Sequence, residues 1–374
     1  MRVVIAPDKF KGSLDAAGVA SALAAGVRDV VPDASCELVP MADGGDGTVA
    51  AFVAGGATST RVVVPGPLGR PVRAEYARDG DTAIIEMASA SGLGADPARQ
   101  PLQASTEGTG ALVRDALDHG ARRIVLGIGG SATTDGGAGA LAALGARFYD
   151  GAGAPLDATP AALADVARID LTGLDTRLRD IDLAVACDVD NPLLGPNGAA
   201  AIYGPQKGAR PADVTFLERV LTRLADAMSV ATGEDLRDLP GAGAAGGLGW
   251  ALASACGARL ERGVKLVAEV RGLAAALRGA DWCFTGEGRI DAQTLHGKVV
   301  VGVAELATQA GVPVVAFGGS VDLAAEPGLR ERGVHCVPIA PGPMTFETAM
   351  HETATHLRAA AARVTALLAT AAGS

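Results

Sequence analysis

The chain has 374 residues, which is enough for two or three domains with sizeable hydrophobic cores. Apolar residues make up 49% of it and glycine adds 51 residues, a composition that excludes intrinsic disorder. The net charge of −10, without a run of basic residues, argues against a protein that binds a nucleic-acid backbone.

The N-terminal part of the sequence predicts a βαβ unit. An apolar run at 2–6 is followed over 14–31 by apolar residues at helical spacing, and Pro32 ends that helix. A second strand is expected near 37–41. A strand, a helix and a strand in this order imply a parallel pair with a right-handed crossover, as in α/β sheets.

Residues 61–87 follow a different pattern. Three short β-rich runs, at 61–64, 72–77 and 82–87, are separated by turn sequences instead of helices. We therefore expect a meander that belongs to a second sheet.

The alternation of strands and helices then returns and continues to the C-terminus. In chain order the sequence predicts a helix over 106–119, a strand at 124–128, a helix near 136–144, a strand at 181–186, an amphipathic helix over 211–231, a mostly helical stretch over 250–278, a strand at 282–285, a helix over 298–310, strands at 314–317 and 334–338, and a long Ala-rich helix over 345–370.

Targeting signals and membrane spans are not expected. No stretch approaches the 18–20 uninterrupted apolar residues of a membrane span, and the first ten residues form a short apolar strand broken by charge, which is not the pattern of a signal peptide. The five cysteines are odd in number and have no C-x-x-C spacing, which is typical of a reducing compartment. The sequence therefore predicts a cytoplasmic protein without a membrane or nucleic-acid partner.

Five of the predicted strands are followed by loops rich in glycine and charge. In open α/β sheets, ligands bind beyond the carboxyl ends of the strands, so these loops are the candidate site. They contain, in chain order, Asp8, Lys9 and Lys11; Asp43 and Asp46; Gly129, Gly130 and Ser131; Asp188, Asp190 and Asn191; and Glu287, Arg289 and Asp291.

These residue types suit phosphoryl transfer. Glycine turns expose backbone N–H groups to phosphate, lysines neutralise its oxygens, and carboxylates hold Mg²⁺ or orient an attacking hydroxyl. Aspartates without histidines favour Mg²⁺ over zinc. Structural roles stay open: Asp43 and Asp46 also fit a turn with a helix cap, and Arg289 could simply pair with Glu287 or Asp291.

Two glycine patterns raise a different function. Residues 127–132 fit G-x-G-x-x-A after a predicted strand, which is typical of dinucleotide-binding folds. Residues 241–246 fit G-x-G-x-x-G, but no strand precedes them, so close packing and ligand contact both remain open. A Walker A motif is absent, because Gly297 and Lys298 lack the upstream glycine and the following hydroxyl residue.

Taken together, the motifs resemble the bacterial glycerate kinase type I family. The resemblance covers nearly the whole chain in order and departs from the usual pattern at Thr134, Ala292 and Val300. The segments that carry it are 6–14, 42–48, 127–137, 186–196, 203–208, 243–249 and 285–294, with Gly297 and Lys298.

This resemblance implies an ATP- and Mg²⁺-dependent kinase that phosphorylates D-glycerate, usually to 2-phosphoglycerate. It also implies two discontinuous α/β domains with the active site in the cleft between them. One is a flavodoxin-like (Rossmann-like) domain with a parallel sheet, expected at 1–60, 92–132 and 281–374. The other has a mixed sheet and a restriction-enzyme-like core, expected at 61–91 and 133–280.

The chemistry of the matched residues suggests roles. We expect Lys11, with Ser131 and its glycine turn, to bind the glycerate carboxylate, and Lys298 to pair with the transferring phosphate. Asp188 is the first candidate for the carboxylate that orients the substrate hydroxyl, and Asp8 is the second. The remaining candidates are Asp43, Asp46 and Glu287 for Mg²⁺, and Gly129, Gly130, Asn191 and Asp291 for substrate or phosphate.

Other functions remain open at this point. The product could be 3-phosphoglycerate, or the chain could be a non-catalytic module that senses a sugar acid. A dinucleotide-dependent oxidoreductase is a third alternative that rests on residues 127–132. A homo-oligomer is also compatible with the sequence.

Overall fold

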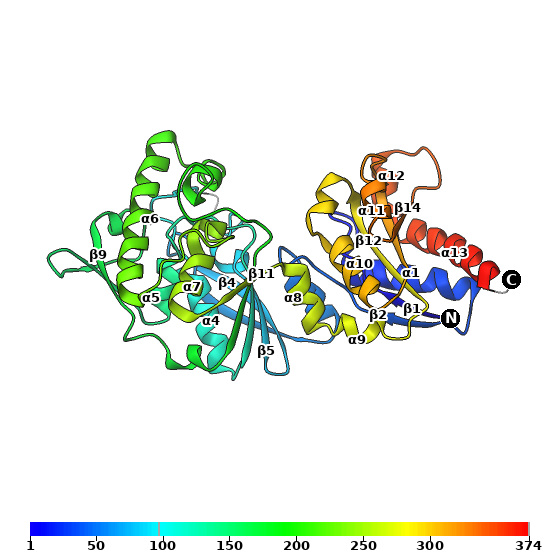
Figure 1. Ribbon diagram of the computed structural model, residues 1–374, viewed down its shortest axis with the longest axis horizontal. Coiled ribbons are helices and arrows are strands. Elements are labelled where there is room, and N and C mark those ends of the chain that lie inside the picture. Colours follow the sequence, from blue (N-terminus) through cyan, green and yellow to red (C-terminus); the bar gives the residue numbers. More distant parts are fainter. Residues whose placement is uncertain (96–97, 373–374) are drawn as a thin grey trace. The chain divides into compact units, whose positions relative to one another are not determined.

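The computed structural model describes residues 1–95 and 98–372 and divides into two compact units (Figure 1). Unit 1 comprises Met1–Asp43, Ala50–Gly55 and Val264–Ser374. Unit 2 comprises Gly44–Val49 and Gly56–Gly263. Each unit has its own hydrophobic core.

Unit 1 is built on a five-stranded parallel sheet in the order β14-β13-β12-β1-β2. Numbered within the unit, this order is 2-1-3-4-5, that of flavodoxin-like folds, which confirms the predicted parallel domain. The strands are β1 (Arg2–Ile5), β2 (Ser35–Leu38), β12 (Trp282–Ile290), β13 (Val314–Val321) and β14 (Val334–Pro338).

Helix α1 (Ala16–Val30) follows the predicted apolar spacing and packs against α13 (Thr353–Ala372), so the first and last helices lie side by side (Figure 1). Asp15 caps α1 by accepting from the Gly18 N–H at 2.7 Å. A Cβ added at Gly26 would lie 2.2 Å from the Arg358 carbonyl oxygen, so glycine permits the close helix contact. The other helices assigned at least partly to unit 1 are α2 (Thr48–Ala54), α8 (Gly263–Val270), α9 (Leu273–Leu277), α10 (Val299–Gln309), α11 (Glu326–Arg330) and α12 (Phe346–His351).

Unit 2 contains a six-stranded mixed sheet in the order β11-β10-β6-β5-β4-β3. Its first four strands are parallel, and β5, β4 and β3 form the antiparallel meander that the turn sequences predicted. The strands are β3 (Thr58–Pro65), β4 (Pro71–Asp79), β5 (Thr82–Glu86), β6 (Arg123–Gly127), β10 (Asp182–Ala186) and β11 (Arg259–Glu261).

The two units divide the chain differently from the expected domains. Residues 92–132 were expected beside the N-terminal strands, but β6 pairs with β5 and β10 and therefore belongs to unit 2. Residues 264–280 were expected in the second domain but belong to unit 1. Strand pairing between distant segments decides the first assignment, and local sequence patterns do not encode it.

Helices pack around the mixed sheet of unit 2, and the largest fully buried side chain of the described chain, Trp250, lies in this core. A second, three-stranded sheet in the order β8-β7-β9 was not predicted, because its strands have only two to five residues each. Its strands are β7 (Arg147–Asp150), β8 (Pro155–Leu156) and β9 (Val166–Asp170), and the main helices of the unit are α3 (Ala88–Ser91), α4 (Glu107–Asp118), α5 (Ala138–Ala143), α6 (Pro211–Thr232) and α7 (Leu248–Cys256).

Three sequence-based boundaries were wrong. The mostly helical stretch at 250–278 is interrupted by β11, and the C-terminal helix is broken between α12 and α13. Strand β12 continues to Ile290, because its backbone pairs with β13 as far as Val321. Glu287 therefore lies in a strand and not in the expected loop.

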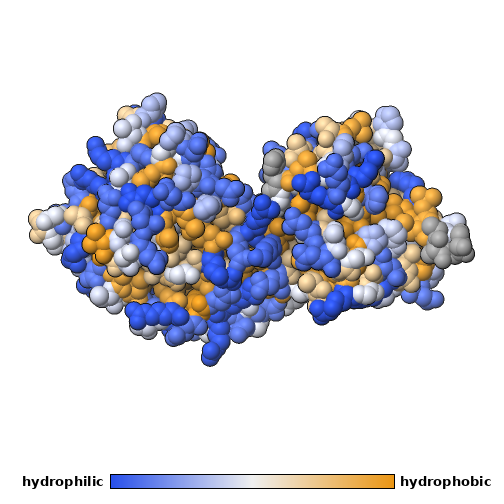
Figure 2. Space-filling view, viewed as in Figure 1, coloured by the Kyte–Doolittle hydropathy of each residue, from blue (hydrophilic) through white to orange (hydrophobic). Residues whose placement is uncertain are grey.

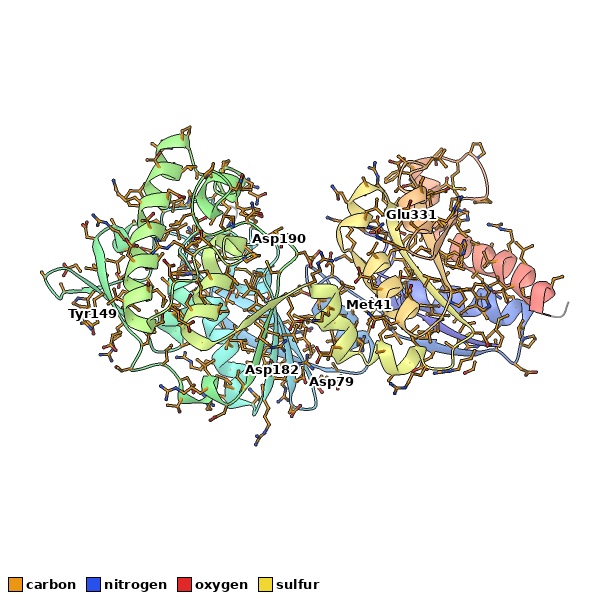
Figure 3. All side chains as sticks on the ribbon, in the orientation of Figure 1. Met41, Asp79, Tyr149, Asp182, Asp190 and Glu331 are labelled. Atoms are coloured by element: carbon orange, nitrogen blue, oxygen red, sulfur yellow. The ribbon has the colours of Figure 1, made fainter. Side chains whose placement is uncertain are left out.

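Two aspartates mark the two ends of strand β10. Asp182 begins β10 and Asp190 lies beyond its end, so these residues mark opposite ends of the strand in unit 2 (Figure 3). On the displayed face, hydrophilic residues are interspersed with apolar ones (Figure 2). Among the described residues, no helix is long and apolar enough to cross a membrane.

The close contact of α1 with α13 can be tested by substitution. Gly26→Ala should lower the free energy of unfolding by about 1–3 kcal/mol, because the new methyl group would overlap the Arg358 backbone. Urea unfolding followed by circular dichroism measures this loss. Ser21→Ala, at an exposed position of the same helix, is the control and should be nearly neutral. Equal stability of the two variants would contradict the close packing.

Candidate functional site

The candidate site of unit 1 lies where the strand order reverses, between β1 and β12. The backbone N–H of Asp8 donates to the Gly286 carbonyl at 2.9 Å, which fixes the chain just beyond β1. Glu287, the next residue on β12, is 6% exposed. Ligands bind at such switch points in open α/β sheets, so the fold itself marks this edge.

Glu287 is held by two groups from the segment that follows β12. The Thr294 hydroxyl donates to Glu287 Oε1 at 2.5 Å, and Lys298 Nζ lies 3.8 Å from Glu287 Oε2. Lys298 immediately precedes α10 and is about one-third exposed. An exposed ammonium beside a buried carboxylate leaves N–H donors that can reach a charged ligand.

Burial and like charge shift the acids of this edge. Burial first, and the neighbouring Asp43 carboxylate second, raise the pKa of Asp8 to about 7, although the Lys9 N–H donates to Asp8 Oδ1 at 2.7 Å. Burial also raises the pKa of Glu287, with Asp291 and Asp43 adding to the rise and Thr294 and Lys298 opposing it. Asp8, Asp43 and Glu287 are therefore electrostatically coupled, and we call them the acidic cluster.

The loop with Lys11 is shaped by close backbone contacts. The Phe10 and Leu14 backbones exchange hydrogen bonds of 2.8 and 3.0 Å, and Gly12 has a φ of +81° within this turn. A Cβ at Gly288 would lie 3.4 Å from the Lys11 nitrogen, in ordinary van der Waals contact, so β12 and this turn pack against each other. The Lys11 side chain is exposed on this loop.

Asp291 has a structural task in the described contacts. Its Oδ1 accepts from the Gln293 N–H at 2.8 Å, and its N–H donates to the Thr294 hydroxyl at 3.0 Å, which caps the short helix Ala292–His296. Arg289 Nε lies 3.1 Å from Asp291 Oδ2, as the alternative interpretation of this loop anticipated. Asp291 thereby fixes Thr294, which in turn holds Glu287.

In unit 2, two glycine loops meet at the carboxyl ends of β6 and β10. A Cβ at Gly127 would lie 2.0 Å from the Gly44 carbonyl oxygen, and one at Gly44 would lie 2.5 Å from the Ala186 Cβ. Gly129 and Gly130 are exposed, and Gly130 has a φ of +71°. These glycines leave main-chain groups on the surface where larger residues would cover them.

Ser131 follows this glycine turn and is 6% exposed. Its backbone bridges to Gly92, and the next residue, Ala132, donates its N–H to the Ser91 carbonyl at 2.9 Å. The serine thus lies where the loop turns from the surface into the core of unit 2.

Asp188 and Asn191 follow β10 and both make local hydrogen bonds. Asp188 Oδ1 accepts from the Gly263 N–H at 3.0 Å, at the start of α8. Asn191 donates to the Asn197 carbonyl at 2.8 Å and accepts from the Tyr203 hydroxyl at 2.5 Å. Both side chains therefore stabilise the loop that carries them.

The acidic cluster has the donor chemistry of a magnesium site. Carboxylates that raise one another's pKa would be relieved by a divalent cation, and Mg²⁺ takes one or two carboxylates and retains water. Within residues 1–95 and 98–372, no group of three His, Cys, Asp or Glu side chains is spaced as a metal site. Asp46, which was predicted with Asp43 and Glu287, belongs to unit 2 and is exposed, so its role stays a prediction.

Neither glycine pattern is placed as a dinucleotide fingerprint requires. Helix α5 begins at Ala138, so residues 128–137 separate it from β6 and the pattern at 127–132 does not open a helix. In the second pattern, a Cβ at Gly243 would lie 2.2 Å from the Pro192 carbonyl and one at Gly246 2.2 Å from the Thr133 carbonyl. The glycines at 243 and 246 serve close packing.

Three features of the structure escaped sequence reasoning. Thr294 and Lys207 both stand in segments that carry the resemblance, but nothing in the sequence shows that one holds Glu287 or that the other is buried. A cavity of about 590 Å³ in unit 2 was also not anticipated, and its described lining, with Arg70, Gln103 and Glu107, includes none of the predicted site residues.

Comparison with known proteins identifies similar chains. The profile of the glycerate kinase family matches residues 3–369. The glycerate kinase of Bacillus subtilis (strain 168) is 46% identical over 374 residues, covering 98% of this chain and 97% of the relative. The glycerate 2-kinase of Escherichia coli (strain K12) is 47% identical and covers 86% of both chains. A crystal structure described as glycerate kinase 2 from Salmonella typhimurium LT2 matches with a TM-score of 0.90, 44% identity and full coverage of both chains.

The raised pKa of Asp8 predicts a pH-dependent stability. The folded-state pKa of about 7 exceeds the ordinary value of 3.8, so ionised Asp8 costs stability that grows as pH rises from about 4 to about 7. Asp8→Asn should therefore unfold at a higher temperature than the wild type at pH 8, with a smaller difference at pH 5. Thermal unfolding without divalent cations measures this.

Asp29→Asn, in the same unit, is the matched control. A hydrogen bond from Arg358 lowers the pKa of Asp29, so this substitution should bring no gain in stability at pH 8. A loss of stability in Asp8→Asn at pH 8 would contradict the burial of an uncompensated charge.

Proposed function

The chain belongs to the glycerate kinase family, and we propose that it transfers the γ-phosphoryl group of ATP to the 2-hydroxyl of D-glycerate. The products would be 2-phosphoglycerate and ADP. Support for the 2-hydroxyl comes from a relative at 47% identity that is named glycerate 2-kinase. The family and its relatives carry the kinase activity, and the regiochemistry is the part that needs a direct test.

The observation that carries the proposed mechanism is the acidic cluster at the switch point of unit 1. A general base works best when its pKa lies near the working pH, and the pKa of Asp8 is raised to about 7. Asp8 and Asp188, the first candidate from the sequence, each accept one backbone N–H, so the distinguishing feature of Asp8 is its burial beside Asp43 and Glu287. We therefore assign the orienting carboxylate to Asp8.

The transfer requires one bond to form and one to break. The 2-hydroxyl oxygen of glycerate attacks the γ-phosphorus, the bond from that phosphorus to the bridging oxygen of ADP breaks, and Asp8 accepts the hydroxyl proton. The Lys298 ammonium neutralises charge on the phosphoryl oxygens, while Glu287, which is itself fixed by Thr294, holds that ammonium near the cluster.

Mg²⁺ fits the carboxylates of this cluster, with Asp43 and Glu287 as the side chains of unit 1 that would hold it. When bound, it supplies positive charge to the phosphate oxygens. In unit 2, the exposed Gly129 and Gly130 turn offers backbone N–H groups to an anion, and Ser131 adds a hydroxyl beside it. Lys11, exposed on its glycine turn, remains the candidate cation for the glycerate carboxylate.

The product is tested by incubating the protein with ATP, Mg²⁺ and D-glycerate and recording the ³¹P NMR spectrum. A 2-phosphoglycerate signal is expected. A 3-phosphoglycerate signal would preserve the kinase and overturn the proposed hydroxyl. A folded protein that binds glycerate without turnover would favour the sensing module.

The assignment of the base is tested by an isosteric pair of variants. Asp8→Asn and Asp188→Asn each keep an oxygen that can accept the local backbone hydrogen bond, so both should fold. Asp8→Asn should lower kcat by about 10²–10⁴-fold, which is the usual contribution of a positioned acid or base. Asp188→Asn should lose less than about tenfold.

Initial rates with a coupled ADP assay give kcat and KM for both variants. A large loss in Asp188→Asn together with a mild one in Asp8→Asn would return the role to Asp188.

A further inference from the structure

Lys207 is a buried lysine outside the proposed catalytic groups. It lies in the short helix Pro205–Lys207 of unit 2 and is only 2% exposed. Its ammonium donates a hydrogen bond to the Thr133 carbonyl, which belongs to the loop that follows the Gly129 and Gly130 turn. A buried ammonium is costly unless it is bonded and electrostatically balanced, so this contact calls for a reason.

The balancing charge belongs to the same loop. Asp135 is buried, and its carboxylate accepts from the Thr106 N–H and hydroxyl, both at 2.7 Å, and from the N–H groups of Gly139 at 3.1 Å and Gly137 at 3.2 Å. Burial lowers the pKa of Lys207 to about 7, and the Asp135 charge opposes that fall. Lys207 and Asp135 thus hold the loop at positions two residues apart.

A third contact also fixes this loop. The Gly136 N–H donates to the Gly246 carbonyl at 2.9 Å, and a Cβ at Gly246 would lie 2.2 Å from the Thr133 carbonyl oxygen. The inner part of the loop is therefore fixed from three directions, while its outer part, Gly129 and Gly130, stays exposed. Of these contacts, the bond from Lys207 is the side-chain tether closest to the exposed turn.

We propose that Lys207 is a positioning residue that fixes the Thr133 backbone and thereby aims the exposed turn at Gly129 and Gly130 toward a bound phosphate or carboxylate. This inference rests on the proposed function, in which that turn binds an anion of ATP or glycerate. Backbone donors stabilise a transition state only when they are held in place before it forms. A displacement of about 1 Å can cost about 10²-fold in rate.

The test compares Lys207→Met with Lys207→Arg. Methionine fills the buried space without an N–H group, and kcat should fall by about 10–100-fold with a smaller change in KM, because the aimed donors act mainly in the transition state. Arginine keeps the charge and donors, and a neighbouring cavity of about 10 Å³ lined by Lys207 gives it some room. It should restore part of the lost kcat.

Arg99→Leu is the matched control. Arg99 Nη1 donates to the Gln206 carbonyl at 2.9 Å, next to Lys207, so the variant removes a tether of the same short helix and leaves the bond to Thr133 intact. Its kcat should stay within about twofold of the wild type. Should Lys207→Met fail to fold, Lys207→Gln carries the same test, because its amide is too short to reach Thr133.

Hydrogen exchange of peptides spanning 129–137 separates this inference from the proposed function. Faster exchange in Lys207→Met than in Arg99→Leu shows the loosened loop even if the wild type has no turnover with glycerate, which would count against the proposed function alone. A folded Lys207→Met or Lys207→Gln variant with wild-type kcat and wild-type exchange would overturn the role of Lys207. A similar loss in Arg99→Leu would overturn it too, since the effect would then belong to the whole short helix.

Discussion

The pairing of β1 with β12 is the constraint on which the chemistry of unit 1 depends. It joins the start of the chain to a strand far along the sequence, with Val4 opposite Cys283, and the backbone bond from Asp8 to Gly286 continues it beyond the sheet. The strand order reverses at this pair. The segments that follow β1 and β12 therefore run in opposite directions and leave the carboxyl ends of the two strands exposed. Main-chain hydrogen bonds, not flexible side chains, therefore bring Asp8 and Glu287 to the same edge.

In unit 2, glycine residues allow the loops to approach one another closely. Its loops approach one another so closely that a side chain at Gly44, Gly127 or Gly246 would overlap neighbouring backbone or Cβ atoms. Glycine is entropically costly to order, so such contacts need strong anchors. The buried Lys207 and Asp135 anchor the loop that contacts Gly246, by bonding to the Thr133 carbonyl and to the Gly137 and Gly139 N–H groups, while Gly129 and Gly130 stay exposed.

The sequence predicted local features well and long-range ones poorly. Helical spacing located α1 and α6, turn residues located the meander, and the glycine-rich loops after the strands marked the candidate residues. Sequence patterns could not show that β6 pairs with β5 and β10, because that pairing is decided between distant segments. They also could not separate Asp291, which caps a short helix, from Glu287, which is buried in a strand, because both appear as acids in one polar segment.

The pKa is raised at both Asp135 and Asp8, but the surroundings of the two carboxylates differ. Asp135 has a raised pKa, but its carboxylate accepts four hydrogen bonds. The buried side chain therefore stabilises the loop that contains it. Burial, and then the charges of Asp43 and Glu287, raise the pKa of Asp8 to about 7, although the Lys9 N–H and the Lys9 charge oppose the rise. A group that the fold stabilises so little in its ionised form serves stability poorly, whereas a pKa near neutrality suits proton transfer. The difference in hydrogen-bond partners therefore supports the proposed proton-accepting role for Asp8 and a structural role for Asp135.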